Sequence, residues 1–140
     1  MSIDFATRLQ AVLTRIHDAE RRFQRPVNSV RLLAASKTQP ATAIAALATA
    51  GQHRFGENYL QEALDKMAEL EGLDLEWHFI GPIQTNKTRG LAEHFAWVHS
   101  VDRLKIAERL NAQRPAEMPP LNICLEVNIC LLYTSDAADE

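Results

Sequence analysis

The sequence predicts an α/β fold of the (β/α)8 TIM-barrel class, with about the first five strands of the barrel present. Along the 140 residues, short apolar segments alternate with segments of helical periodicity, which is the order of a parallel sheet with right-handed crossovers. Residues 121–129 alternate apolar with polar side chains, so one face of that strand is polar. A doubly wound sheet buries both faces of its strands against helices, whereas a barrel can hold polar groups inside. The polar face therefore favours the barrel.

The first part of the chain predicts a helix, a strand and a second helix. Apolar residues recur at intervals of three and four from 5 to 23, which predicts an amphipathic helix that Pro26 ends. The apolar segment 30–36 predicts the first strand. Pro40 suits the first position of the next helix, and Gly51 can adopt the left-handed conformation that ends it.

The same strand–helix unit recurs along the rest of the chain. Further strands are predicted at residues 53–55, 75–80, 97–101 and 121–129. The helices between them are predicted to end at Gly72, to span residues 85–95, and to follow a cap at Asp102. Together these units would form a little more than half of a barrel.

Composition argues against several classes of protein. Hydrophobic residues make up 46% and charged residues 24% of the chain, as in an ordinary globular domain. The net charge of −3, without a basic cluster, argues against nucleic acid as a partner. The start lacks a secretory signal and no apolar run approaches the roughly 18 residues that span a bilayer, so we expect a cytoplasmic protein without a membrane partner. Cys124 and Cys130 are expected to be free thiols.

Lys37 is the first candidate functional residue, because it directly follows the first predicted strand. Active-site residues of barrels gather at this end of the strands. At the rim of an apolar pocket, a lysine loses solvation of its ammonium, which favours the neutral amine that attacks an aldehyde. A solvated lysine at a strand end is nevertheless the commoner arrangement, and position alone does not decide between the two.

Asn58 and His78 lie near the ends of the second and third strands. Asn58 offers a donor and an acceptor, either to orient a ligand hydroxyl or a backbone loop, or to cap the next helix. His78 shares a strand face with Glu76. It either polarises a ligand oxygen or is hydrogen-bonded inside the barrel, which is the commoner role.

Other motifs give weaker signals. Gln84, Asn86 and Lys87 crowd the first turn of the next helix, where they can hold an anion or act as cap and surface residues. The remaining histidines show no metal-ligand spacing, so no metal site is expected. The sequence also lacks a nucleophile elbow, a dinucleotide-binding loop and a Walker loop.

Four segments together resemble the pyridoxal phosphate homeostasis proteins, which are relatives of the alanine racemase barrel. These segments are residues 33–38 (LAASKT), 55–59 (FGENY), 77–81 (WHFIG) with Gln84, Asn86 and Lys87, and 101–104 (VDRL). The resemblance runs from the first helix to about Ile129. It implies a fold-type III barrel that binds pyridoxal 5′-phosphate (PLP) through a Schiff base on Lys37. Asn58 and His78 are the further candidates for cofactor binding.

The resemblance implies PLP homeostasis, by cofactor buffering or delivery to apo PLP-dependent enzymes, without established catalysis or a catalytic residue. One alternative is a PLP-dependent amino-acid racemase, which needs a second base across the cofactor ring. Tyr59 is the only tyrosine within the family-like part, and its place beside Asn58 does not put it there. The other alternative is a fragment that neither folds stably nor binds a ligand.

Residues 130–140 (CLLYTSDAADE) depart from the family pattern, in which a polar loop follows Ile129. They are interpreted as a non-family tail, of the kind that sequencing-adapter read-through produces, so the predicted domain is residues 1–129. The family's phosphate-binding groups come from the last strands of the barrel. This predicts that residues 1–140 alone hold PLP poorly.

Overall fold

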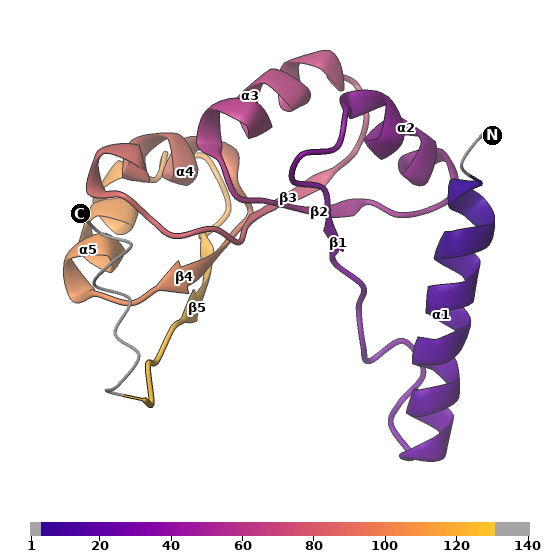
Figure 1. Cartoon of the computed structure of the whole chain (residues 1–140). Helices are drawn as coiled ribbons and strands as arrows, with labels where there is room; N and C mark the ends of the chain where they lie inside the picture. The colour runs from indigo at the N-terminus through magenta and orange to yellow at the C-terminus, as the bar shows by residue number, and fades with distance from the viewer. Residues whose placement is uncertain (1–3, 131–140) are drawn as a thin grey trace.

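A computed structural model, which describes residues 4–130, shows a curved parallel sheet with helices on its convex side (Figure 1). The strands are β1 (Ala34–Ala35), β2 (Arg54–Glu57), β3 (Glu76–Phe79), β4 (Trp97–Val101) and β5 (Asn122–Leu125). The helices are α1 (Phe5–Arg22), α2 (Ala41–Thr49), α3 (Leu60–Glu69), the 3-10 turn η1 (Thr85–Lys87), α4 (Thr88–His94) and α5 (Leu104–Gln113).

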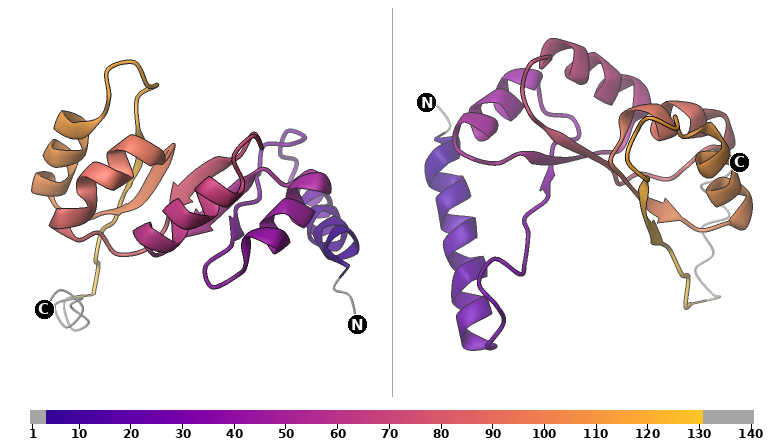
Figure 2. Two further views of the ribbon diagram at one scale, coloured as in Figure 1. Left: turned by 90° about the horizontal axis from the view of Figure 1, so that it is seen from above. Right: turned by 180° about the vertical axis from the view of Figure 1, so that it is seen from behind.

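The order of the strands identifies the architecture. The five strands lie in the sheet in their sequence order, and every neighbouring pair is parallel. A doubly wound sheet would reverse the strand order at a switch point, whereas a barrel wall keeps it. Seen from above and from behind, α1 and β5 lie at opposite ends of the arch (Figure 2). The predicted fold, the first five strands of a TIM-type barrel, is confirmed.

The hydrophobic core lies between the convex face of the sheet and helices α2 to α5. Its fully or almost fully buried large side chains include Phe55, Phe95, Ile44, Leu91, Ile106, Leu110 and Val98. Burial of one such side chain stabilises the fold by roughly 1.5–3 kcal/mol. Because the strand residues in this core point outward, alternate residues of the same strands point to the concave face.

The first strand is shorter than predicted, because part of its segment is held elsewhere. Glu20, buried on α1, accepts hydrogen bonds from the backbone N–H groups of Asn28 and Val30, at 3.1 and 2.9 Å. The side chain of Gln52 donates to the carbonyl of Leu32 at 3.0 Å. These backbone groups are therefore satisfied without a neighbouring strand, and the prediction of a strand over 30–36 was wrong at its N-terminal end.

Several other boundaries differ from the predictions. Residues 85–87 form a 3-10 turn before α4, and β5 ends at Leu125. Pro40 is the N-cap of α2 instead of its first residue. Asp102 does not cap α5, whose N-cap is Arg103, and its carboxylate lies 3.4 Å from the Arg103 side chain instead. The second strand extends to Glu57, which places the Gly-Glu pair of the FGENY motif inside the sheet.

Within residues 4–130, no helix is long and apolar enough to cross a membrane. Cys124 and Cys130 are free thiols. Residues 131–140, which make up most of the predicted non-family tail, lie outside the described residues.

Candidate functional site

The concave face of the sheet carries a cluster of polar and aromatic side chains, which we call the histidine cluster. Strand register pairs Arg54 with Glu76 and His78 with Trp97. His78 Nε2 lies 2.7 Å from Glu76 Oε1, and His78 Nδ1 lies 2.9 Å from His99 Nε2. The His78 ring stacks on Trp97, with ring centroids 5.6 Å apart. The concave face is therefore polar on β2, β3 and β4, whereas the sequence predicted a polar face on residues 121–129.

Burial keeps both histidines of this cluster neutral near pH 7. Desolvation lowers the pKa of His78, against the opposing effect of its hydrogen bond to Glu76. Desolvation also lowers the pKa of His99, and the charge on His78 lowers it further. Because a carboxylate only accepts, neutral His78 donates from Nε2 to Glu76 and accepts at Nδ1 from the Nε2–H of His99. Both ring nitrogens of His78 are thus engaged within the protein.

Lys37 lies in a tight turn at the carboxyl end of β1. The backbone N–H of Gln39 donates to the carbonyl of Ser36 at 3.0 Å, and Thr38 has a φ of 64°. A positive φ is strained for a β-branched residue, so surrounding contacts must hold this conformation. Lys37 is exposed, and its amine has no hydrogen bond or ion pair with residues 4–130.

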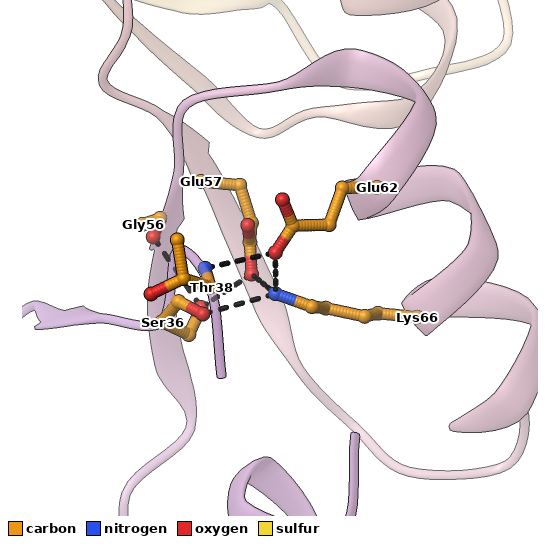
Figure 3. A network of polar contacts seen from close by, with 6 residues as sticks. All are labelled: Ser36, Thr38, Gly56, Glu57, Glu62 and Lys66. Atoms are coloured by element: carbon orange, nitrogen blue, oxygen red, sulfur yellow. Dashed lines mark hydrogen bonds and ion pairs between the residues drawn. The ribbon is translucent and has the colours of Figure 1, made fainter. Parts of the chain in front are cut away.

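A second group of charges, which we call the lysine network, holds this turn (Figure 3). It is centred on Lys66 of α3, whose ammonium donates to the carbonyl of Ser36 at 2.9 Å. The same ammonium pairs with Glu57 at 2.8 Å and with Glu62 at 2.7 Å. Ser36 Oγ donates to Glu57 Oε1 at 2.7 Å. The backbone N–H of Thr38 donates to Glu62 Oε1 at 2.8 Å.

The lysine network fixes Lys66 as a charged ammonium. Burial acts to lower the pKa of Lys66, but hydrogen bonds and charges from Glu57 and Glu62 outweigh it and raise this pKa. In return, the hydrogen bond from Lys66 lowers the pKa of Glu62. Three acceptors use all three ammonium hydrogens, so this amine has no lone pair for attack on an aldehyde.

The four lysines of the chain therefore differ in what they can do. Lys66 is buried and fully paired. Lys87 lies in η1 and Lys105 in α5, and both are exposed. Lys37 alone lies in the loop that directly follows a strand. Among these amines, Lys37 has the position of a barrel active-site residue.

Asn58 follows β2 at the same edge of the sheet. Its side-chain oxygen Oδ1 is buried and has no hydrogen-bond partner within the described chain. The N-cap of α3 is Tyr59, and no side chain caps this helix, so Asn58 does not have the capping role considered from the sequence. Its backbone packs tightly against Gly81, because a Cβ at Gly81 would lie 2.5 Å from the Asn58 carbonyl oxygen. Asn58 thus presents an unused acceptor on a fixed backbone.

Strand register shows how far along the strands Lys37, Asn58 and His78 lie relative to one another. Ala35 of β1 pairs with Gly56 of β2, so Lys37 and Asn58 each lie two residues beyond a matched pair. His78 pairs with Gly56 and is therefore deeper in the sheet. No hydrogen bond joins any two of the three among residues 4–130. Lys37 and Asn58 share the rim, whereas His78 belongs to the interior.

A hollow of about 660 Å³ opens beside Asn58, between the loops that follow β2 and β3. Its polar lining includes the predicted anion-binding residues Gln84, Asn86 and Lys87, together with Arg103. Arg103 also donates to the carbonyl of Ile83 at 3.3 Å. The motif residues of the two loops therefore gather at the carboxyl edge of the sheet, although Lys37 does not line this hollow.

Comparison with known proteins identifies the family. Residues 8–131 match the model of the alanine racemase N-terminal domain. The chain belongs to this family. It is 60% identical over 124 residues to a pyridoxal phosphate homeostasis protein of Pseudomonas aeruginosa, covering 89% of this chain and 54% of the relative. It is 54% identical over 129 residues to the protein of that name in Escherichia coli K12, covering 90% and 55%.

A solved structure of this alanine racemase-like fold is also similar. PipY of Synechococcus elongatus PCC7942, solved with PLP bound, aligns with a TM-score of 0.64 and 48% identity, covering 78% of this chain and 47% of PipY. The predicted resemblance to the homeostasis proteins is thus confirmed. The chain spans about half the length of the curated relatives it matches.

The sequence of this family member did not predict the lysine network or a role for His99. One local signal was available, because Glu62 and Lys66 are four residues apart on a helix, the spacing of an ion pair. Ser36 and Glu57 meet only because β1 and β2 pair, which local sequence does not reveal. His99 has no metal-ligand spacing in the sequence. Its partner is His78 on the neighbouring strand, 21 residues away, so the contact depends on strand pairing.

Proposed function

We propose that this chain binds PLP through Lys37 and serves PLP homeostasis, as the lysine-bearing part of a barrel. The observation that carries the proposal is the difference among the lysines. Lys66 is held in two ion pairs, whereas the Lys37 amine has no hydrogen bond or ion pair among residues 4–130 and lies at the carboxyl edge, on the turn that the lysine network holds. The PLP found in PipY and the names of the relatives support the same cofactor.

The residues at the rim fit this cofactor. PLP supplies an aldehyde, which condenses with a neutral amine with loss of one water. Lys37 would provide that amine. The unused acceptor Oδ1 of Asn58 suits the phenolic hydroxyl of the PLP ring, and the buried site would make such a hydrogen bond valuable. His78 would support the barrel interior, because both of its ring nitrogens are already engaged with Glu76 and His99.

The phosphate of PLP needs several donors in a fixed cradle. In barrels, such a cradle is commonly formed by the loops after strands seven and eight. The five strands of this chain would therefore contribute the amine and the ring contacts. The phosphate donors would come from the part of the relatives that this chain does not span.

The proposed role is buffering or delivery of PLP to apo PLP-dependent enzymes, without turnover. The racemase alternative has the family model in its favour, but racemisation needs a second base on the opposite face of the substrate. Tyr59 is 61% exposed at the N-cap of α3, and it lines the hollow beside Asn58, which Lys37 does not line. Sustained alanine racemisation that Tyr59→Phe abolishes would replace the proposal with the racemase function.

The proposal is tested by titrating PLP and following the visible absorbance of the bound cofactor. The chain is compared with a chimera that adds the C-terminal part of the Pseudomonas aeruginosa relative. We expect saturable binding by the chimera, weak binding by the chain alone, and loss of binding in Lys37→Ala but not in the control Lys105→Ala, an exposed position on α5. Equal binding by Lys37→Ala and the unmodified chimera would refute the proposal.

A further inference from the structure

The turn after β1 is held on both sides by the lysine network, in which Lys66 and Glu57 are buried and Glu62 is partly exposed. Before Lys37, the carbonyl of Ser36 accepts a hydrogen bond from Lys66, and the hydroxyl of Ser36 donates one to Glu57. After Lys37, the backbone N–H of Thr38 donates a hydrogen bond to Glu62. These partners come from β2 and α3, so the turn is tied to two other elements of the fold (Figure 3).

These contacts account for the strained backbone of the turn. Thr38 has a positive φ, which a β-branched residue adopts only when its surroundings over-determine the conformation. The Glu62 carboxylate binds the N–H of this strained residue, and Lys66 binds the carbonyl two residues earlier. Relaxation of the turn would take the Ser36 hydroxyl from the completely buried Glu57, and the Ser36 carbonyl from the Lys66 ammonium.

We propose that Lys66, Glu57 and Glu62 are positioning residues for Lys37. They fix the conformation of the turn and so set the direction in which the Lys37 side chain leaves the sheet. The inference rests on the proposed function, in which Lys37 holds PLP. The network acts through the backbone on either side of Lys37, because it has no contact with the amine itself.

Glu62→Ala is the most informative variant. The Glu62 side chain is 32% exposed, and its removal leaves the pair between Lys66 and Glu57 in place. PLP attachment to the full chain is trapped with cyanoborohydride and located by peptide mass mapping. We expect attachment at Lys37 to slow about tenfold, the effect of losing one hydrogen bond to a charged group. Glu69→Ala, at an exposed position of the same helix, is the matched control and should leave the rate unchanged.

A second measurement needs no cofactor. Hydrogen exchange of the Thr38 amide, followed by NMR, should accelerate in Glu62→Ala while the amides of β4 keep their protection. Glu62→Gln retains an oxygen acceptor for this amide and should keep more of its protection and more of the attachment rate. Thr38→Gly in the Glu62→Ala background should restore attachment, because glycine adopts a positive φ without strain.

The outcomes separate the two proposals. An unchanged attachment rate at Lys37 in Glu62→Ala, with the protection of Thr38 lost, would overturn the positioning role and leave the proposed function intact. Failure of the unmodified chain to attach PLP at Lys37 at all would overturn the proposed function, and the positioning role with it.

Discussion

Two groups of ionisable side chains lie on opposite faces of the same sheet, one at β2 and the other mainly on β3 and β4. The lysine network is sealed between β2 and α3, and its ammonium has all of its hydrogens paired. The histidine cluster lies on the concave face, where Glu76 is 39% exposed and both histidines have lowered pKa values. The convex face therefore uses permanent charges to hold backbone geometry. The concave face presents groups whose charge can change near neutral pH.

The largest expected difference between the two groups is in stability. Lys66→Met leaves Glu57 buried without its partner and should lower the free energy of unfolding by about 3–5 kcal/mol. Glu76→Gln, in the histidine cluster, should lower it by less than about 1 kcal/mol, because this pair is partly solvated. Urea titrations measure both values. The double variant Lys66→Met, Glu57→Gln should recover part of the lost free energy of unfolding. Equal losses in Lys66→Met and Glu76→Gln would show that the two groups do not differ in their contribution to stability.

The next largest difference in stability is expected between alanine substitutions at Gly81, in the loop after β3, and Gly90, in α4. Gly81→Ala would place a Cβ 2.5 Å from the Asn58 carbonyl oxygen, so the backbone must shift, at a cost of about 1–3 kcal/mol. In Gly90→Ala, the closest atom is the flexible end of Leu60, at 2.6 Å, and this helical position gains from alanine. The midpoint temperature of thermal unfolding should therefore be clearly higher in Gly90→Ala than in Gly81→Ala. Similar values would show that the contact with Asn58 is easily relaxed.

Acidification should affect the two groups differently. The folded pKa values of His78 and His99 lie below the ordinary 6.5, so their stabilising contribution is full above pH 6.5 and is lost as the pH falls through the folded values. The stabilising contribution of Glu62, whose pKa is lowered, is full above pH 4.5. That of Lys66, whose pKa is raised, is full below pH 10.5.

The free energy of unfolding should thus fall between pH 7 and pH 5, which we take as roughly the window of histidine titration. The fall should be smaller in His99→Gln, whose amide can still donate to His78. Urea titrations across this pH series measure the slope. An identical slope in His99→Gln would assign the acid sensitivity to other groups.

The smallest expected change in stability belongs to Asn58. Its Oδ1 has no partner among the described residues, so Asn58→Leu should change the free energy of unfolding by less than about 0.5 kcal/mol. The same variant in the chimera should weaken PLP binding about tenfold, through loss of one hydrogen bond. Unchanged PLP affinity, measured by the absorbance titration, would remove Asn58 from the site.

Patterns local in sequence predicted the fold well, and contacts distant in sequence explain most of the errors. Residues 97–101 were predicted as a strand and form β4 within the same limits, because a short apolar segment after a helix is sufficient evidence. Strand β1 was predicted too long, because Glu20 binds the backbone of Val30 across ten residues. The motif around Lys37 identified its place at the sheet edge. It did not reveal Lys66, which lies 30 residues from the Ser36 carbonyl that it binds.

We propose that Lys37, and not another amine of the chain, holds PLP. The most direct test is to reduce the PLP-treated chain and chimera with borohydride and to map the pyridoxyl group among the lysines and the N-terminus by mass spectrometry. We expect the label mainly on Lys37 and none on Lys66 in the folded protein, because Lys66 becomes reactive only after unfolding. A label found mainly on Lys66 or Lys87 of the folded protein would contradict this proposal.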